Sequence, residues 1–503
     1  MAVRNARQLC GLCPRIYGDL MKKTNINLIP DSQNPTPDYY CTWQTQLYAT
    51  SDGKPKGQRA IIGEKALFDM EKPFGWAYFY KKARNDLIFV MDDSWDVSIC
   101  DDPNEYGSLI LNREKFPVST DGVKTNAESL KRLTDRIKSL GWKGLGGWVC
   151  AQEAPNDADA PEIYWQKRLI EANEAGFSYW KVDWGKKGMS LAFRKMLTDM
   201  GKRYAPDLVI EHAMRPEIIP DAAVFRTYDV PALMSIPMTM EKLNALKNTS
   251  GALINCEDEA YIAAAGGFSM GIMRHQYSGA FPDGKADMSF PSVHRDLKTK
   301  LYEVIRAARF HRIAPAFSAP FVTDEKRLYD TWRFVREEEE IEAWWLGNPL
   351  IKNDIKNGIL TKSAPTSFAR KCPFPLVLPD ENGDIPYTVV SKNPNGVFSV
   401  ATLGRTRDRE YFIPRCEISL DIENADTVGV FGSYQRLVLH TEHKKISKVL
   451  MQDLADDFAY DITDDISFSD GVLTVSGGLI EKIGTSAQPK SDTSEAGVLI
   501  KIF

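Results

Sequence analysis

Strand-like and helix-like segments alternate from about residue 38 to 330 of this 503-residue chain, and this alternation limits its fold more than any other feature. Eight short apolar runs are typical of strands: 38–43, 87–93, 142–150, 179–184, 207–213, 223–229, 252–258 and 268–274. Helical patterns accompany them at 126–140, 164–175 and 297–310. Because parallel strands joined through helices favour right-handed crossovers, the sequence predicts an α/β fold with a (β/α)₈ TIM barrel.

The pattern changes after about residue 335, where helical periodicity fades and turn signals become frequent. Short strand-like runs then follow at 397–403, 426–431, 437–439, 472–475 and 497–502. This composition is typical of an antiparallel β-sandwich. We therefore expect three parts: an irregular N-terminal lead-in at 1–37, the barrel at 38–335 and a C-terminal β-sandwich at 336–503.

Charge and hydropathy exclude several classes of partner. The formal net charge is −5 and no long basic run occurs, so we expect neither nucleic acid nor a membrane as a partner. No run has the apolar length of a membrane span. Residues 1–30 lack the continuous apolar core of a secretory signal, which leaves the location open between the cytoplasm and a mature periplasmic or secreted form. The oligomeric state is not determined by the sequence.

The cysteine pattern gives no metal site. Cys10 and Cys13 form a single CxxC, with no second pair of cysteines or histidines at zinc spacing nearby. We therefore expect structural or paired cysteines, and neither a metal nor a cofactor.

Three of the predicted barrel strands end in carboxylates. Lys181 and Asp183 lie two residues apart at the end of the run 179–184, on the same face of the strand. A charged pair at the end of a buried strand is costly unless it is used or neutralised. The runs that end at Asp92-Asp93 and at Asp229 repeat this design. Because function in such barrels lies where the strands end, these residues predict an acid/base site that binds polyols.

The other residues at the predicted rim support the same chemistry. Polar and aromatic side chains at or just past the strand ends are Trp43, Asp92, Asp93, Trp95, Trp148, Glu153, Lys181, Asp183, Glu211, His212, Arg226, Asp229 and Asp258. Carboxylates and lysine can bind sugar hydroxyls, and an aromatic ring can cover the C–H face of the sugar. Cleavage of a glycosidic bond also needs two carboxyl groups beside the anomeric carbon. The expected partner is therefore an oligosaccharide or polysaccharide substrate.

Several ordered motifs resemble one clan of enzymes. They are Cys41-Thr42-Trp43, Met91-Asp92-Asp93-Ser94-Trp95, Lys115-Phe116-Pro117, 140–148, 176–183 and Phe225-Arg226-Thr227-Tyr228-Asp229. In this order they resemble the clan of glycoside hydrolase families 27 and 36, the α-galactosidases and their relatives. The resemblance covers about residues 40–330 and, more loosely, the terminal sandwich.

The resemblance implies a retaining, exo-acting α-glycosidase of the α-galactosidase type. Asp183 would attack the anomeric carbon, and Asp229 would protonate the leaving oxygen and then activate water. The substrate-binding residues would be Trp43, Asp92, Asp93, Trp148, Lys181, Glu211 and Arg226. Two alternatives remain: a transglycosylase on the same scaffold, and a carbohydrate-binding homologue that has lost catalysis.

The chain departs from the family pattern at three places. Ser94 replaces the usual glycine, and Asp229 follows Arg226 by three residues where four are usual. The loop 211–215 lacks the cysteine or tryptophan pattern expected for simple galactose recognition. Arg215 and His212 would there favour a modified, acidic or branched sugar; alternatively, Arg215 only pairs with Glu211 or Glu217.

Overall fold

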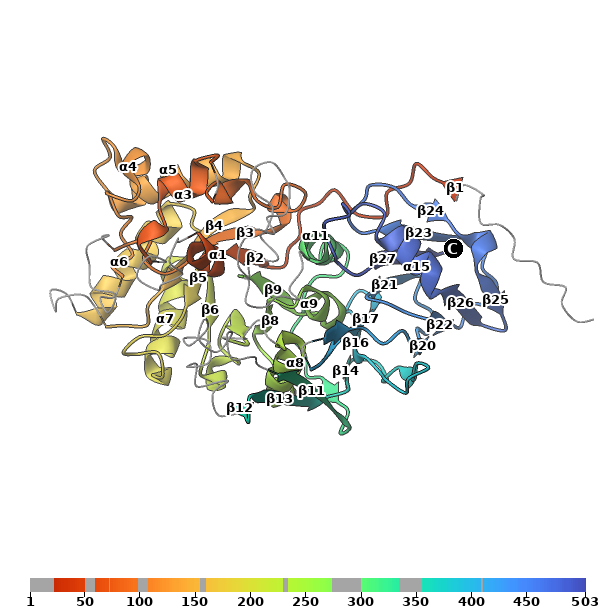
Figure 1. The fold of residues 1–503 in the computed structure, drawn as a ribbon. Helices are drawn as coiled ribbons and strands as arrows, with labels where there is room; N and C mark the ends of the chain where they lie inside the picture. Colours follow the sequence, from red (N-terminus) through yellow and green to blue (C-terminus); the bar gives the residue numbers. More distant parts are fainter. Residues whose placement is uncertain are drawn as a thin grey trace, which may run out of the picture.

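Eight parallel strands close into a barrel in chain order (Figure 1). The computed structural model describes residues 22–49, 59–71, 73–97, 107–153, 160–228, 234–273, 300–333, 355–408 and 410–503. The barrel strands are β2 (Tyr39–Cys41), β3 (Ile88–Met91), β4 (Gly144–Val149), β5 (Tyr179–Val182), β6 (Val209–His212), β7 (Val224–Arg226), β8 (Leu253–Glu257) and β9 (Ser269–Ile272). Each predicted strand range contains one of them, and β9 pairs with β2 to close the ring, so the predicted fold class is confirmed.

Helices follow most of the barrel strands. Those described are α1 (Trp43–Tyr48), α3 (Glu64–Phe68), α4 (Pro117–Thr120), α5 (Asn126–Ser139), α6 (Pro161–Glu174), α7 (Leu191–Tyr204), α8 (Ser235–Leu246), α9 (Ala260–Gly266) and α11 (Leu301–Phe310). The start of α5 is fixed by a capping box, in which Thr125 and Glu128 satisfy each other's backbone N–H groups. The predicted helices at 126–140 and 164–175 are confirmed. The third prediction began at 297, and residues 297–299 lie outside the described residues.

Alternation along each strand divides side chains between the barrel interior and the surrounding helices. On β5, Trp180 contacts Trp165 of α6, with ring centroids 6.1 Å apart. Its neighbours Tyr179 and Lys181 point the other way, into the barrel. Because the period is two, Asp183 also faces inward at the end of the strand. The sequence of a four-residue strand thus decides which groups reach the barrel mouth.

Glycines make room for two tyrosines in the barrel interior. A Cβ on Gly146 of β4 would lie 2.6 Å from the Cβ of Tyr179. A Cβ on Gly271 of β9 would lie 2.5 Å from Cζ of Tyr39. Such distances exclude a larger residue at either position without movement of its neighbour. The two tyrosine rings fill the centre of the barrel, 5.0 Å apart between centroids.

The C-terminal part forms two larger sheets around one apolar core. One sheet has the order β1-β24-β23-β27-β21-β17-β16-β14-β10, and the other β15-β20-β22-β26-β25. A three-stranded sheet, β11-β13-β12, and the hairpin β18-β19 complete this part. The strand bounds are β1 (Lys22–Lys23), β10 (Val322–Thr323), β11 (Arg327–Arg333), β12 (Ile355–Lys356), β13 (Ile359–Pro365), β14 (Ser367–Arg370), β15 (Leu376–Leu378), β16 (Tyr387–Lys392), β17 (Phe398–Leu403), β18 (Arg405–Arg407), β19 (Glu410–Phe412), β20 (Glu417–Asp421), β21 (Thr427–Phe431), β22 (Arg436–His440), β23 (Val449–Asp453), β24 (Tyr460–Asp461), β25 (Ser467–Ser469), β26 (Val472–Ser476) and β27 (Gly497–Ile502).

All five predicted C-terminal strand runs coincide with strands of these sheets. Most neighbouring strands are antiparallel, and three pairs are parallel: β14–β16, β17–β21 and β20–β22. A single apolar cluster contains residues from both larger sheets, among them Phe398 of β17 and Leu437 of β22. Helix α15 (Gly477–Gly484) packs beside β23 and β27.

Two segments join these sheets from outside the range 336–503. β1 pairs with β24, although it lies in the stretch we expected to be an irregular lead-in. β10 and β11 pair with β14 and β13, although they precede residue 335. Strand pairing fixes these segments because it satisfies their backbone hydrogen bonds. We therefore propose that the change of domain falls between α11 and β10.

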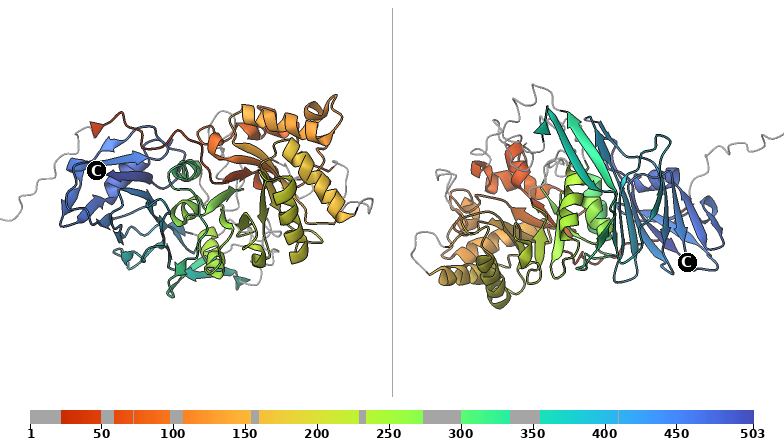
Figure 2. Two further views of the ribbon diagram at one scale, coloured as in Figure 1. Left: turned by 180° about the vertical axis from the view of Figure 1, so that it is seen from behind. Right: turned by 90° about the horizontal axis from the view of Figure 1, so that it is seen from below.

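Helices α9 and α11 lie between the barrel and the nine-stranded sheet (Figures 1 and 2). Arg306 of α11 binds Asp453 of β23 through two contacts, Nε–Oδ1 at 2.8 Å and Nη2–Oδ2 at 3.1 Å. Phe310 of α11 packs on Gly429 of β21, where a Cβ would lie 2.4 Å from its ring. Across the described part of the chain, no helix combines the length and apolarity that a membrane crossing needs.

Candidate active site

Asp183 directly follows β5, and two donors hold its carboxylate at the barrel mouth. Trp148 of β4 donates its indole N–H to Oδ2 at 2.9 Å, and Arg226 of β7 donates from Nη2 to Oδ1 at 3.1 Å. Burial alone would raise the pKa of Asp183, but the charges of Arg226 and Lys181 outweigh it and hold that pKa below its ordinary value. Asp183 is therefore an ionised carboxylate fixed in one orientation.

Arg226 is surrounded by three carboxylates. Besides Asp183, its Nη1 donates to Oε2 of Glu257 at 3.0 Å, and its Nε lies 3.0 Å from Oε1 of Glu211. Only 2% of Arg226 is exposed, so water does not screen these contacts. Burial alone would lower the pKa of Arg226, but the carboxylates, Asp183 first, raise it well above its ordinary value. The guanidinium is permanently charged and is held on all three sides.

Glu211 lies one inward-facing layer below Asp183. It pairs in register with Lys181 of β5, and Asp183 is the next inward residue on that strand. Tyr179 donates to Oε2 of Glu211 at 2.8 Å, and Tyr39 donates to Oε1 at 3.3 Å. Burial raises the pKa of Glu211 to about 7, although the charge of Arg226 opposes this. We predicted a substrate ligand here, and the structure shows the carboxylate paired with Arg226.

Asp92 and Lys181 form a second buried ion pair at the mouth. Lys181 Nζ lies 2.6 Å from Asp92 Oδ2, and both side chains are almost fully buried. Cys41 of β2 donates its thiol hydrogen to the same oxygen, and Asp93 donates its backbone N–H to Oδ1 at 2.8 Å. Burial alone would lower the pKa of Lys181, but Asp92 reverses this and holds the pKa above its ordinary value. Lys181 therefore stays charged.

Asp93 has a different partner from Asp92. Arg59 donates from Nε to Asp93 Oδ2 at 2.9 Å, and the Ser94 hydroxyl donates to Oδ1 at 3.0 Å. Burial raises the pKa of Asp93 to about 6 against the charge of Arg59. Ser94 has φ 78°, a left-handed conformation that glycine adopts without steric cost. This explains why glycine is usual at this position in the families that the motif resembles.

Tryptophans form the aromatic part of the mouth. The Trp148 ring lies 5.9 Å from that of Trp184, measured between centroids. Trp95 donates its indole N–H to the backbone oxygen of Trp148 at 3.0 Å and so supports β4 from behind. Trp43 is the first residue of α1, is half-buried and packs against the side chains that fill the barrel interior.

The two basic residues of the loop 211–215, His212 and Arg215, make contacts within the protein. His212 points to α7, where Nε2 contacts the Thr198 hydroxyl at 2.8 Å and Nδ1 lies 3.2 Å from Arg194. Burial lowers the pKa of His212 to about 3, so its ring is neutral. Arg215 binds Glu217 at 3.1 Å, which confirms the alternative of a local pair. His212 is therefore uncharged and Arg215 is already paired, so neither is placed to select an acidic sugar.

Three further residues complete the predicted set. Asp258 accepts the backbone N–H of Met273 at 2.7 Å and thus connects β8 to the end of β9. Glu153 pairs with Lys187 at the surface, at 2.5 Å. Asp229, the predicted acid/base, lies outside the described residues.

Several residues of this site were not predicted from the sequence. Glu257 was passed over for its neighbour Asp258, although the alternation along β8 places Glu257 inside the barrel. Tyr39 and Tyr179 could have been found by the same two-residue period. Arg59 carried no signal, because it precedes the second strand by almost thirty residues and reaches Asp93 only through the tertiary fold.

The described residues contain no cluster of three or more histidine, cysteine, aspartate or glutamate side chains arranged to hold a metal ion. The carboxylates at the mouth instead pair with Arg226, Lys181 and Arg59. What this arrangement offers chemically is an ionised, oriented carboxylate, Asp183, beside hydrogen-bonding carboxylates and the indole of Trp148.

No family model matches the chain, and no curated protein matches it. Among solved structures, a candidate α-galactosidase from Bacteroides fragilis aligns with a TM-score of 0.42 and 10% identity, over 93% of this chain and 79% of that one. A GH27 β-L-arabinopyranosidase from Geobacillus stearothermophilus aligns with a TM-score of 0.40 and 10% identity, over 93% of this chain and 97% of that one. A candidate α-N-acetylgalactosaminidase from Bacillus halodurans aligns with a TM-score of 0.39 and 10% identity, over 96% of this chain and 99% of that one. These similar structures are glycoside hydrolases by name, and the fold assignment itself rests on the strand pairing of the barrel.

Proposed function

We propose that this protein is a retaining, exo-acting α-glycosidase that removes terminal galactose-configured sugars from oligosaccharides or polysaccharides. The observation that carries the proposal is the state of Asp183. Its carboxylate is buried, has a lowered pKa, and is oriented by Trp148 and Arg226 at the end of a barrel strand. A nucleophile for a sugar must be ionised and fixed in this way.

In the proposed reaction Asp183 attacks the anomeric carbon and forms a glycosyl-enzyme intermediate. Asp229 protonates the leaving oxygen and then removes a proton from the attacking water. Arg226 has no proton to give at neutral pH and serves to orient Asp183. The mechanism requires the two carboxyl groups to lie about 5–5.5 Å apart, whereas an inverting enzyme would hold them about 6.5–9.5 Å apart.

Sugar recognition is proposed for the Asp92–Lys181 pair and for Asp93. Carboxylate oxygens accept hydrogen bonds from neighbouring hydroxyls, and Lys181 donates. The resembled families use this aspartate pair to read an axial 4-hydroxyl. We therefore infer a galactose-configured sugar, such as galactose, N-acetylgalactosamine or arabinopyranose.

The test is hydrolysis of four p-nitrophenyl glycosides: α-galactoside, α-N-acetylgalactosaminide, β-L-arabinopyranoside and α-glucoside. We expect clear turnover of at least one of the first three and little of the glucoside. Preparations of Asp183→Asn made in parallel exclude a contaminating glycosidase. A preference for the glucoside would refute the proposed role of the aspartate pair, and no turnover at all by a folded protein would contradict the function.

Retention is tested by following the product anomer by NMR. The first product of an α-glycoside should be the α-anomer, and initial formation of the β-anomer would contradict double displacement. Addition of a sugar acceptor distinguishes hydrolysis from transglycosylation, because a transglycosylase would form a longer saccharide in preference to the free sugar.

The role of Asp229 has its own test. Asp229→Ala should slow natural glycosides by about 10²–10⁴-fold and aryl glycosides with good leaving groups less, because the latter need little protonation. Azide should restore deglycosylation and yield a glycosyl azide of retained configuration. If azide does not rescue Asp229→Ala but does rescue Asp258→Ala, the acid/base is Asp258.

A further inference from the structure

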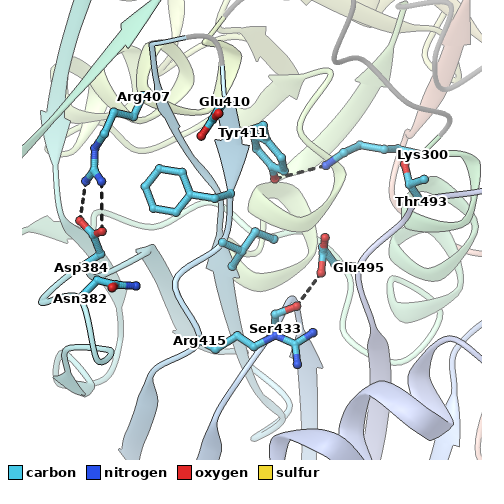
Figure 3. Close-up of a pocket in the computed structure, with 12 residues that line it drawn as sticks. Lys300, Asn382, Asp384, Arg407, Glu410, Tyr411, Arg415, Ser433, Thr493 and Glu495 are labelled. Atoms are coloured by element: carbon cyan, nitrogen blue, oxygen red, sulfur yellow. Dashed lines mark hydrogen bonds and ion pairs between the residues drawn. The ribbon is translucent and has the colours of Figure 1, made fainter.

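A cavity of about 870 Å³ lies beside the hairpin β18-β19 (Figure 3), and none of the carboxylates described at the barrel mouth lines it. The hairpin β18-β19 crosses it and contributes Arg407, Glu410 and Tyr411. The start of α11 contributes Lys300, and the segment before β27 contributes Glu495. Figure 3 shows Arg407 on one side of Tyr411 and both Lys300 and Glu495 on the other. Ligand sites commonly have volumes of about 300–1,000 Å³, so the cavity can hold an oligosaccharide.

The charges around this cavity balance. The described lining has three cations, Lys300, Arg407 and Arg415, and three carboxylates, Asp384, Glu410 and Glu495. An anion such as phosphate would meet the carboxylates, and a cation would meet the guanidinium groups. A neutral ligand with many hydroxyls can instead donate to the carboxylates and accept from the arginines and the lysine.

Several of these groups are already held in place. Arg407 donates to Asp384 at 2.6 Å and 3.3 Å, and Arg415 binds Glu481 at 3.0 Å. Ser433 donates to Glu495 at 2.5 Å. Each arginine has five N–H donors, so these contacts leave others for a ligand. Groups that are oriented in advance cost less entropy when a ligand binds.

Tyr411 supplies an aromatic surface beside these polar groups. Tyr411 is 37% exposed, so part of its ring can be reached by a ligand. Gly404 allows this placement, because a Cβ there would lie 2.2 Å from Cζ of Tyr411. Lys300 Nζ contacts the hydroxyl at 3.4 Å. An exposed ring among fixed donors and acceptors has the chemistry that a sugar ring needs: C–H groups cover the aromatic surface while hydroxyls form hydrogen bonds.

We propose that this cavity is a second carbohydrate-binding site, which holds a neutral glycan away from the barrel mouth. The choice of glycan rests on the proposed function, and a galactose-bearing polysaccharide is the natural probe. The site would keep the protein attached to a polymer while successive terminal sugars are removed at the barrel.

The experiment is affinity electrophoresis through gels that contain galactomannan. Every variant carries Asp183→Asn, so the polymer is not consumed. The comparison is between Tyr411→Ala, Tyr411→Phe and the control Tyr329→Ala, which removes a 64% exposed tyrosine on β11. Tyr411→Ala should raise the apparent dissociation constant at least about tenfold, as loss of a central aromatic anchor does. Tyr411→Phe and the control should bind like the parent.

The second site would be refuted if the gel retarded all variants equally. It would also be refuted if the gel did not retard the parent protein. Thermal unfolding of each variant shows whether lost binding reflects lost structure; a folded Tyr411→Phe that binds and a folded Tyr411→Ala that does not would support the site. Turnover of aryl glycosides by the wild type is measured separately. Binding that depends on Tyr411 without any turnover would reject the glycosidase proposal and leave the site standing.

Discussion

Two buried arginines in this protein have opposite surroundings. Arg306, between α11 and the nine-stranded sheet, faces one carboxylate, Asp453, and otherwise neutral acceptors: Oε1 of Gln488 at 2.8 Å and the backbone oxygen of Glu495 at 3.0 Å. Arg226, at the barrel mouth, faces three carboxylates. One cluster is balanced and the other carries more negative charge than its guanidinium can neutralise.

The difference separates a structural pair from a site of chemistry. A buried ion pair compensates its desolvation only when charges and hydrogen bonds match, as they do for Arg306. Excess carboxylates raise the free energy of the folded state, and perturbed pKa values accumulate at functional sites for this reason. Burial raises the pKa of Glu211 to about 7, and the nearby carboxylate of Glu257 adds to this rise. The contrast predicts that changes at Arg226's partners affect turnover first, whereas changes at Arg306's partner affect stability first.

The largest effect is expected for Asp183→Asn. Loss of the nucleophile should reduce turnover by about 10³-fold or more, equivalent to about 4 kcal/mol of barrier. Asparagine has the same shape and can still accept from Arg226, so the fold should persist. Aryl glycoside kinetics and thermal unfolding measure the two quantities. Near-normal turnover by a folded variant would exclude Asp183 as the nucleophile.

The opposite outcome is expected for Asp453→Asn. Removal of this charge leaves Arg306 buried without its counter-ion and should cost about 3–5 kcal/mol of unfolding free energy. The folded protein should keep its turnover, because no described contact links Asp453 to the barrel mouth. Urea unfolding gives the stability. The control is Asp135→Asn, which breaks the exposed pair with Lys131 on α5 and should cost at most about 0.5 kcal/mol. Equal costs for both variants would contradict the distinction.

Glu257→Ala tests whether the carboxylates position Arg226. Without Glu257, the guanidinium loses its contact on one side, and Asp183 loses its fixed orientation. A displacement of this kind should lower kcat by about 10–100-fold, with a smaller change in KM. Glu257→Gln keeps an acceptor for Nη1 and should restore part of the loss. If Glu257→Ala changed only stability, and Glu257→Gln restored no activity, a purely structural role would follow.

The smallest effect concerns pH. The pKa of Glu211 rises from 4.5 in the unfolded chain to about 7 in the folded protein. The folded state therefore binds the extra proton, and this contribution to stability is complete below about pH 4.5 and is lost as pH rises through 7. Glu211→Gln cannot titrate, so its stability relative to the wild type should improve by about 1–3 kcal/mol between pH 5 and 8.

The measurement is urea unfolding of both proteins across this range. Asp93 and Asp96, whose pKa values burial raises to about 6 and about 7, are present in both proteins and cancel in the difference. A constant difference in stability from pH 5 to 8 would show that Glu211 is ionised throughout.

The sequence by itself determined most of the fold. Each barrel strand lies in a short, largely apolar run, and such runs can be recognised because the outer face of the strand packs on helices and much of its inner face is buried in the barrel. The alternation along β5 also placed Lys181 and Asp183 on one face, since a two-residue period is a local property of extended backbone. The Gly-rich strand β4 was likewise predicted, within the run 142–150.

Only the tertiary structure decided which charges meet. Arg59 reaches Asp93 from the segment before β3, and Cys41, Lys181 and Asp92 meet from three strands. Glu211 looked like a rim residue, but strand register places it one layer deeper, against two tyrosines. The pairing of β1, β10 and β11 with strands of the C-terminal sheets could not be predicted from the sequence either. Contacts between residues far apart in the chain depend on barrel closure and register, which no local pattern encodes.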